Sequence, residues 1–286
     1  MAGQRTRIFG WCEPSAYCRK HDGTQLAHSS VHVDGSVGEC ELHMASGQVQ
    51  LDRIDALQAN ISAGEVAIGH IAGRADIDGG AFAVRIGEVE GTVGIASSGG
   101  RAWIGHASAD LDLSSGSGGF DIDRADGSVT AKTGDGAIRI GRLTRGPAEL
   151  LNGSGNIEIG ISEGTVGIAS SGARAWIGHA SADLDLSSGS GDFDIDRADG
   201  SVTATTGSGA IRIGRMTHGQ AKLTNGSGNI EVGISEGTAA SVDVNSERGA
   251  VHDFVSSHGN PDPSDRKVMV HARTRHGDII IQRAAS

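Results

Sequence analysis

A chain of 286 residues with a formal net charge of −11 lacks the basic surface that phosphate binding requires, so we expect no nucleic-acid partner. Aromatic residues make up only 3% of the chain and glycine occupies 46 positions, which excludes a large globular core. No apolar run of about 18 residues occurs, so we expect no transmembrane helix and no insertion into a membrane.

The first 30 residues match none of the repeats that follow, and we predict that residues 1–30 form an irregular N-terminal cap or arm. They lack the apolar region of a signal peptide. We therefore expect a cytoplasmic protein, or a cell-surface or secreted one if the true start lies elsewhere. All three cysteines, Cys12, Cys18 and Cys40, lie near this end. They form no metal-ligand spacing and no disulfide framework for the repeats.

The next feature is an internal duplication. Residues 91–163 recur as residues 164–236, and 63 of these 73 positions are identical. Inside each copy a small residue recurs every 18 or 19 positions, at Gly100, Gly118, Gly136, Gly155, Ala173, Gly191, Gly209 and Gly228. A repeat of this length over many turns is typical of solenoids. We predict a β-solenoid over residues 31–286, with the duplication inside it and closing strands near its C-terminus.

Each repeat contains two short segments in which apolar and polar residues alternate. Ile138 and Ile140 belong to one segment, and Ala148 and Leu150 belong to the next. Such alternation, bounded by Gly, Ser, Asn and Asp, is a strand signal, and the frequent glycines disfavour helices. We predict an all-β fold, a single-stranded parallel β-solenoid with 18–19 residues and two short strands per coil. The apolar side chains should point inward.

The residue between the two inward positions of each first strand should lie on the outer face. Coil by coil, this outer row reads Arg85, Trp103, Asp121, Arg139, Glu158, Trp176, Asp194, Arg212 and Glu231. Neighbours in the row should be roughly 5 Å apart. Alternating charges favour this register, since a slip would place like charges side by side.

Two tryptophans interrupt the charged row, four coils apart, which corresponds to about 19 Å. An exposed Trp beside Asp and Arg on a flat β face can stack on a sugar or anchor a partner protein. The alternative is that each ring only packs over neighbouring Arg or Gly residues. We predict a partner-binding face made of Trp103, Trp176, Asp121, Arg139, Glu158, Asp194, Arg212 and Glu231.

Several units have closely related sequences, among them SGSGDFDI, TGSGAIRI and NGSGNIEV, and the C-terminal part contains DVNSERGAVHDF and RKVMVHARTRHGDIIIQ. In these units the chain resembles a bacterial family of adhesin-like β-strand repeats of unknown function. The resemblance covers about residues 40–284, and the C-terminal stretch is its most specific part. It implies a β-solenoid and a role in adhesion or surface binding, and it carries no catalytic residues.

A calcium-binding β-roll is one alternative, because an 18-residue coil equals two nine-residue calcium-binding units, although Asp192 after Gly189 and Gly191 stands one position too early for such a unit. A calcium loop of the EF-hand type is a separate candidate, since Asp121, Asp123 and Asp126 precede a glycine and the same pattern recurs from Asp194 to Asp199. An EF-hand would need its third acid one position earlier and a Glu where Lys132 stands. The competing interpretation is a strand end followed by an Asp-Gly turn.

A hexapeptide acyltransferase is a second alternative, because 18 residues equal three hexapeptides. An aliphatic residue should then recur every six positions, but Gly146 and Asn152 follow Ile140 at these intervals. His70, His106 and His179 share the position after an Ile-Gly pair, and we expect solvated turn histidines there.

No serine elbow and no acid–His–Ser set is present in the sequence. We therefore predict a protein that is not an enzyme and has no cofactor, metal or catalytic residue. The expected function is that of a binding or structural scaffold, which presents its flat outer face to a protein or glycan partner.

Overall fold

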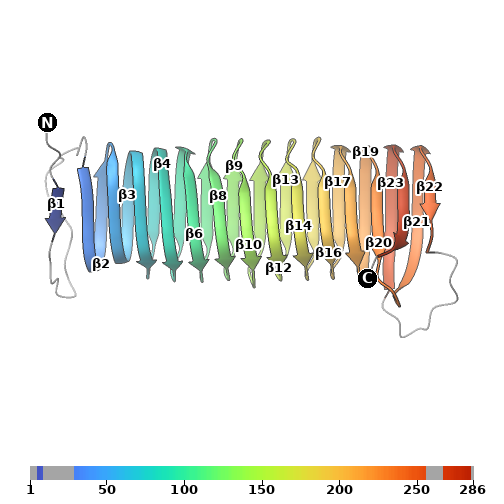
Figure 1. Ribbon diagram of the computed structural model, residues 1–286, viewed down its shortest axis with the longest axis horizontal. Coiled ribbons are helices and arrows are strands. Elements are labelled where there is room, and N and C mark those ends of the chain that lie inside the picture. The colour runs from blue at the N-terminus through green and yellow to red at the C-terminus, as the bar shows by residue number, and fades with distance from the viewer. Residues whose placement is uncertain (1–4, 9–28, 256–266, 285–286) are drawn as a thin grey trace. The chain divides into compact units, whose positions relative to one another are not determined.

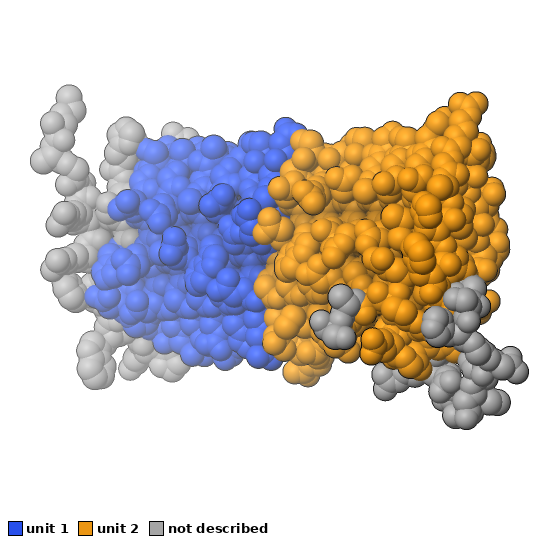
Figure 2. All heavy atoms as spheres, turned by 45° about the vertical axis from the view of Figure 1, so that its right-hand side comes forward, with its two compact units in different colours: residues 1–139 blue, residues 140–286 orange. Residues whose placement is uncertain are grey.

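The computed structural model describes residues 5–8, 29–255 and 267–284, with side chains from residue 32 onward. The chain forms two compact units, residues 1–139 and residues 140–286 (Figure 2). In each unit the described residues form parallel strands that coil as a β-solenoid (Figure 1), which confirms the predicted fold class. Among the described residues no helix is long and apolar enough to cross a membrane.

The first unit is built from the strands up to β9 and the start of β10. Their bounds are β1 (Arg5–Ile8), β2 (Ser29–Met44), β3 (Gly47–Ile71), β4 (Ala75–Val89), β5 (Val93–Gly99), β6 (Arg101–Ala107), β7 (Leu111–Ser115), β8 (Gly119–Ala125), β9 (Val129–Thr133) and β10 (Ile138–Leu143). β1 lies within the segment for which we predicted an irregular cap, and it pairs with β2 in parallel. Cys12 and Cys18 lie outside the described residues, and Cys40 is half-buried.

The early coils of the first unit differ in one detail from the predicted two short strands per coil. β3 continues for 25 residues and therefore passes through a whole coil without interruption. Gly64 allows this in β3, and Gly79 plays the same part in the 15-residue β4, because both have a positive φ and a Cβ at either position would overlap backbone of the coil beneath. From β5 onward the coils contain the short strand pairs that the alternation predicts.

The second unit contains the remainder of β10 and fourteen further strands. Their bounds are β11 (Ala148–Asn152), β12 (Ile157–Ser162), β13 (Val166–Ser170), β14 (Ala175–Ala180), β15 (Leu184–Ser188), β16 (Phe193–Ala198), β17 (Val202–Ser208), β18 (Ile211–Met216), β19 (Gly219–Ser227), β20 (Ile230–Ile234), β21 (Ala239–Arg248), β22 (Val251–Asp253), β23 (Lys267–His276) and β24 (Ile279–Arg283). In the first strands, inward residues stack in register: Ile177 pairs with Ile195, which pairs with Ile213. These side chains are fully buried, so each coil adds a layer to a narrow, continuous apolar core.

Corners between strands are fixed by a short polar side chain and a glycine three residues later. The Ser115 Oγ accepts a hydrogen bond of 2.8 Å from the Gly118 N–H, and Thr133 and Gly136 repeat this arrangement at 3.1 Å. The Thr133 hydroxyl also donates to the carbonyl of Gly118 in the preceding coil at 2.8 Å. One side chain thus closes its own turn and binds the coil beneath it, which explains the recurring Ser/Thr/Asn-Gly-x-Gly pattern.

The C-terminal strands do not stack in chain order. β23 lies between β19 and β21, and β24 lies between β20 and β22 (Figure 1). The register places His271 between Lys222 and Asp243, and it places Ile281 between Val232 and Asp253. The last part of the chain therefore fills a space that the preceding coil, β21 with β22, left open.

Candidate binding face

In the first unit the predicted outer row forms with the expected register. Trp103 pairs with Arg85 on one side and with Asp121 on the other. The Arg85 guanidinium lies over the Trp103 ring, 5.6 Å from its centre, which is a cation–π contact. The Asp121 carboxylate forms ion pairs with Arg139 Nη1 at 3.4 Å and with Arg101 Nε at 3.5 Å. Aromatic, anionic and cationic groups thus share one face.

The same row forms independently in the second unit. Its register runs from Glu158 to Trp176, Asp194, Arg212 and Glu231. The Arg212 Nη1 donates to Asp194 Oδ1 at 2.6 Å. This hydrogen bond raises the pKa of Arg212; burial opposes the shift, and the charges of Asp194, Glu231 and Asp196 add to it. All eight residues of the predicted face therefore lie in the outer rows of their units.

The two tryptophans are partly packed and partly exposed. A Cβ at Gly105 would come within 3.2 Å of the Trp103 ring, and one at Gly178 would come within 3.1 Å of the Trp176 ring. Each ring therefore lies along its own strand, over the glycine two residues ahead. Trp176 remains 38% exposed. Packing of each Trp ring over a glycine was the alternative to an exposed Trp. The structure shows both features together, since the rings lie over glycines and Trp176 is still exposed.

A second row of polar residues lies beside the first and was missed by the sequence analysis. In the second unit His179 pairs with Arg197, which pairs with Arg215. The Asp199 carboxylate joins the first two, since it accepts from His179 Nε2 at 2.7 Å and from Arg197 Nη2 at 3.0 Å. In the sequence, Asp199 stands out only as the last acid of a calcium-like pattern.

The first copy repeats this arrangement. His106 Nε2 lies 3.2 Å from Asp126 Oδ2, and Arg124 binds the same carboxylate through two N–H groups at 2.9 and 3.2 Å. His70 also faces carboxylates, with Glu88 at 3.5 Å and Glu90 at 3.4 Å, and its side chain is only 16% exposed. His106 and His179 remain 35% and 34% exposed, as expected for turn histidines, but each also contacts a carboxylate, and His70 is mostly buried. A clue was present in the sequence, since an Asp follows His106 and His179 at the same spacing of 20 residues.

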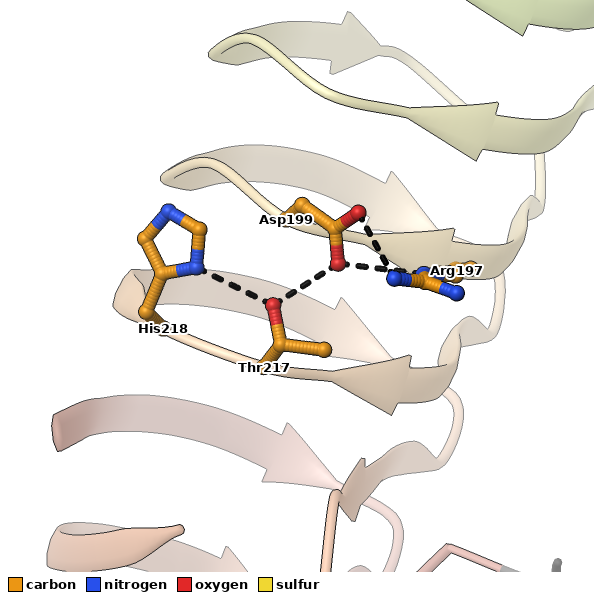
Figure 3. A pocket seen from close by; sticks show the side chains of 4 residues that line it. All are labelled: Arg197, Asp199, Thr217 and His218. Atoms are coloured by element: carbon orange, nitrogen blue, oxygen red, sulfur yellow. Dashed lines mark hydrogen bonds and ion pairs between the residues drawn. The ribbon is translucent and has the colours of Figure 1, made fainter. Parts of the chain in front are cut away.

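Asp199 lines an open hollow of about 480 Å³ together with Arg197, Thr217 and His218 (Figure 3). We call these four residues and His179 the Asp199 cluster. The Thr217 hydroxyl donates to Asp199 Oδ1 at 2.7 Å and lies 3.0 Å from His218 Nδ1. Because this hydroxyl gives its proton to Asp199, the His218 Nδ1 must be the donor in the second contact. Thr217 therefore bridges Asp199 and His218, and the carboxylate that accepts its proton is a weak base because its pKa is held low.

Burial opposes ionisation of Asp199, but its hydrogen-bond partners outweigh burial. Hydrogen bonds from Arg197, His179 and Thr217, together with the charge of Arg197, lower the pKa of Asp199 to about 2. The side chain is 18% exposed. The cluster therefore holds a carboxylate that stays ionised at all ordinary pH values.

A second hollow, of about 370 Å³, is also lined by Arg197. It crosses four strands, β16, β18, β20 and β24, and is lined by Asp196, Arg197, Arg212, Gly214, Arg215, Glu231, Gln282 and Ala284. The Gln282 Nε2 donates to Glu231 Oε1 at 2.8 Å. Gln282 reaches this hollow only because β24 inserts beside β20, which the order of strands along the chain does not predict.

The acidic residues of the calcium alternative are engaged by cations of the chain itself. Asp126 and Asp199 each bind an arginine, and Asp194 binds Arg212. Within the described ranges no group of three or more His, Cys, Asp or Glu residues is arranged to hold a metal ion.

Fold and face together define a β-solenoid repeat protein with polar outer rows. A family model described as Toastrack DUF4097 matches residues 128–282, which is more than half of the chain. The chain therefore belongs to this family, a β-solenoid repeat domain of unknown function. Searches among curated proteins and among solved structures found no match.

Proposed function

We propose that this protein is a non-enzymatic binding scaffold, which uses the outer face of its first strands to hold a protein or glycan partner in an adhesin-like manner. One observation carries the proposal: each unit places a Trp ring in register with an Asp on the next coil, and an Arg follows the Asp. The residues are Trp103, Asp121 and Arg139 in the first unit and Trp176, Asp194 and Arg212 in the second.

The chemistry of this row suits recognition. An indole ring supplies a large apolar area with few rotatable bonds, and it can stack on a sugar or fill a pocket of a protein. Neighbouring carboxylates and guanidinium groups supply acceptors and donors for the polar atoms of a partner. Because Arg85 lies over Trp103, Arg139 pairs with Asp121 and Arg212 pairs with Asp194, part of the row is ordered before binding and less conformational entropy is lost.

Duplication also supports this role. Two copies of one recognition row in one chain allow a partner with repeated features to engage both, and each contact then raises the effective concentration for the other.

The test is a binding screen against arrays of glycans and of cell-envelope proteins, run with wild type, Trp103→Ser, Trp176→Ser and the double variant. We expect each single change to weaken binding and the double change to weaken it far more. Lys222→Gln is the control, since Lys222 is exposed on a second strand, in β19. If the double variant binds every hit like wild type, the outer row is not the recognition surface.

A further inference from the structure

We infer that the Trp176 ring is a binding site for the guanidinium group of an arginine on a partner protein. This inference rests on the proposed binding function and names the chemical group that is bound. The starting observation is a difference between the two copies of the outer row. Arg85 precedes Trp103 in the row, whereas Glu158 precedes Trp176.

In the first unit the chain covers the tryptophan with its own arginine. The Arg85 guanidinium lies 5.6 Å from the centre of the Trp103 ring. Asp121 follows the tryptophan in register, and its two carboxylate oxygens pair with Arg139 at 3.4 Å and with Arg101 at 3.5 Å. The ring and both oxygens thus have cationic partners, and the Trp103 side chain is half-buried.

In the second unit the corresponding place is open. Among the described residues no cation lies over the Trp176 ring, and Trp176 is 38% exposed. Asp194, the next residue of the row, accepts from Arg212 through Oδ1 at 2.6 Å. Its Oδ2 accepts no hydrogen bond from the part of the chain that the structure describes. One aromatic face and one carboxylate oxygen therefore remain for a ligand.

The two rings lie the same way on their strands, so the first copy indicates how a ligand can bind to the second. A Cβ at Gly105 would lie 3.2 Å from the Cη2 atom of Trp103, and a Cβ at Gly178 would lie 3.1 Å from the same atom of Trp176. Each ring thus extends over the glycine two residues ahead. A guanidinium group can therefore take the position over Trp176 that Arg85 has over Trp103.

The charges around Trp176 favour a cationic ligand. Glu158 replaces a positive charge of the first copy with a negative one, and Asp192 replaces a glycine, so this surrounding is more negative by three charges. Arg174 does not alter the difference, because the first copy has Arg101 at the same position. The net charge of −11 also attracts a basic partner to the chain as a whole.

A guanidinium group suits this place better than an ammonium group. It is planar, so it can stack on an indole ring while its N–H groups donate to a carboxylate. Asp194 offers such an acceptor, since it pairs in register with Trp176. An arginine in an exposed segment of a protein carries this group, and Trp and Arg are enriched among the residues that dominate protein interfaces.

Two-dimensional NMR spectra of the full-length protein test the inference, because the indole N–H signals report on each tryptophan separately. The chain has three tryptophans, and the spectra of Trp103→Ser and Trp176→Ser assign the signals. The probe is the peptide Gly-Ser-Arg-Ser-Gly. Two further peptides carry citrulline, a neutral isostere of arginine, or lysine in place of the arginine. Thermal melting establishes that every variant folds.

We expect the arginine peptide to shift the Trp176 signal with a Kd on the order of 1 mM, as befits one cation–π contact with a carboxylate beside it. The citrulline peptide should bind at least about fivefold more weakly because it lacks the charge, and the lysine peptide should also bind more weakly. Added salt should weaken the binding of the arginine peptide. Equal affinity for the arginine peptide and either substituted peptide would overturn the inference.

Exchanging the charges of the two copies provides a second test. Glu158→Arg gives the second copy the arginine of the first and should abolish the shift of the Trp176 signal. Arg85→Glu gives the first copy the acid of the second and should produce a comparable shift at Trp103. Glu149→Arg is the matched control, since Glu149 is exposed on a second strand, and it should bind like wild type. An unchanged Trp176 shift in Glu158→Arg would contradict the inference.

The array screen separates this inference from the proposed function. Protein partners that bind wild type and are lost with Glu158→Arg would support both. If the Trp variants lose a partner but the arginine peptide leaves the Trp176 signal unshifted, the proposed function survives and the guanidinium site is refuted.

Discussion

At the scale of single residues, Asp199 shows how the outer face is held rigid. Its carboxylate accepts from Arg197, His179 and Thr217, and it therefore joins three neighbouring coils, those of β14, β16 and β18. Ion pairs on an exposed surface usually contribute little stability. This carboxylate is only 18% exposed and has three donors, so it should contribute more than an isolated surface pair.

We predict that Asp199→Asn removes a pH-dependent part of the stability. The folded-state pKa of about 2 lies below the ordinary value of 3.8, so the contribution is fully present above pH 3.8 and is lost as the pH falls toward 2. At pH 7 the variant should be less stable by on the order of 1–2 kcal/mol. Urea unfolding between pH 2 and pH 7 measures this difference, which should shrink below pH 4.

Asp196→Asn provides the matched control, because its side chain is 49% exposed. It should change the stability little at any pH. An Asp199→Asn curve that stays parallel to wild type down to pH 2 would refute the assigned role of the carboxylate.

At the scale of strands, the register separates inward from outward residues at adjacent positions. Ile140 is 1% exposed, whereas the neighbouring Arg139 side chain is 45% exposed beside Asp121. We predict that Ile140→Asp prevents stable folding, because it buries a charge without a partner. Arg139→Ser should cost about 0–1 kcal/mol. Thermal melting of the two variants, followed by circular dichroism, measures both losses of stability. Equal losses in the two variants would mean that the register is wrong.

Strand order near the C-terminus gives a further prediction, which uses cysteine pairs. The pairs are introduced into a variant in which Cys12, Cys18 and Cys40 are replaced by Ser. Lys222 pairs in register with His271, so Lys222→Cys with His271→Cys should oxidise to a disulfide at the spacing of about 5 Å. Lys222→Cys with Asp243→Cys should not, since β23 separates the two positions by about 10 Å. Mass spectrometry after oxidation reads out both pairs. A disulfide in the second pair and none in the first would show that β21 stacks directly on β19.

Local alternation predicted the strands, the inward residues and the outer row, because each depends on positions within one coil and on a constant coil length. Leu151 illustrates this, since it directly follows the inward Leu150 in the alternation and is 42% exposed. Insertion of β23 and β24 could not be predicted in this way, because strands that follow in the chain normally stack in order. The hollow with Gln282 depends on that insertion and was missed for the same reason.

One position of the duplication also shows a difference that the sequence repeat hides. Gly100 has a φ of +114°, and a Cβ there would overlap the Phe82 carbonyl oxygen. Its counterpart in the second copy is Ala173, which is fully buried, and no non-glycine residue in the described part of the chain has a positive φ. The two copies therefore turn this corner with different backbone conformations, a choice that depends on the coil beneath.

At the scale of the whole molecule, the duplication repeats contacts as well as residues. Asp110 accepts from the Ser128 N–H at 2.8 Å, and Asp183 accepts from the Ser201 N–H at 2.7 Å. The hydroxyls of Ser97 and Ser115 lie 3.0 Å apart, as do those of Ser170 and Ser188. Each copy thus fixes its own geometry through contacts between nearby coils. The outer row can accordingly recur in each copy without support from a separate core.

The central claim is that outer rows serve recognition while inner rows hold the fold, and thermal melting of two matched double variants tests it most directly. One carries Trp103→Ser and Trp176→Ser. The other carries Phe120→Ala and Phe193→Ala. These phenylalanines point inward, are fully buried, and pair in register with Ala102 and Ala175, the residues that directly precede the two tryptophans. We predict that the Trp variant melts only a few degrees below wild type, since each partly exposed ring contributes about 1–2 kcal/mol. The Phe variant should melt at least about 10 °C lower or not fold, because each cavity costs about 3–5 kcal/mol. If the Trp variant melts as low as the Phe variant, the tryptophans are packing residues and the outer row is not a recognition face.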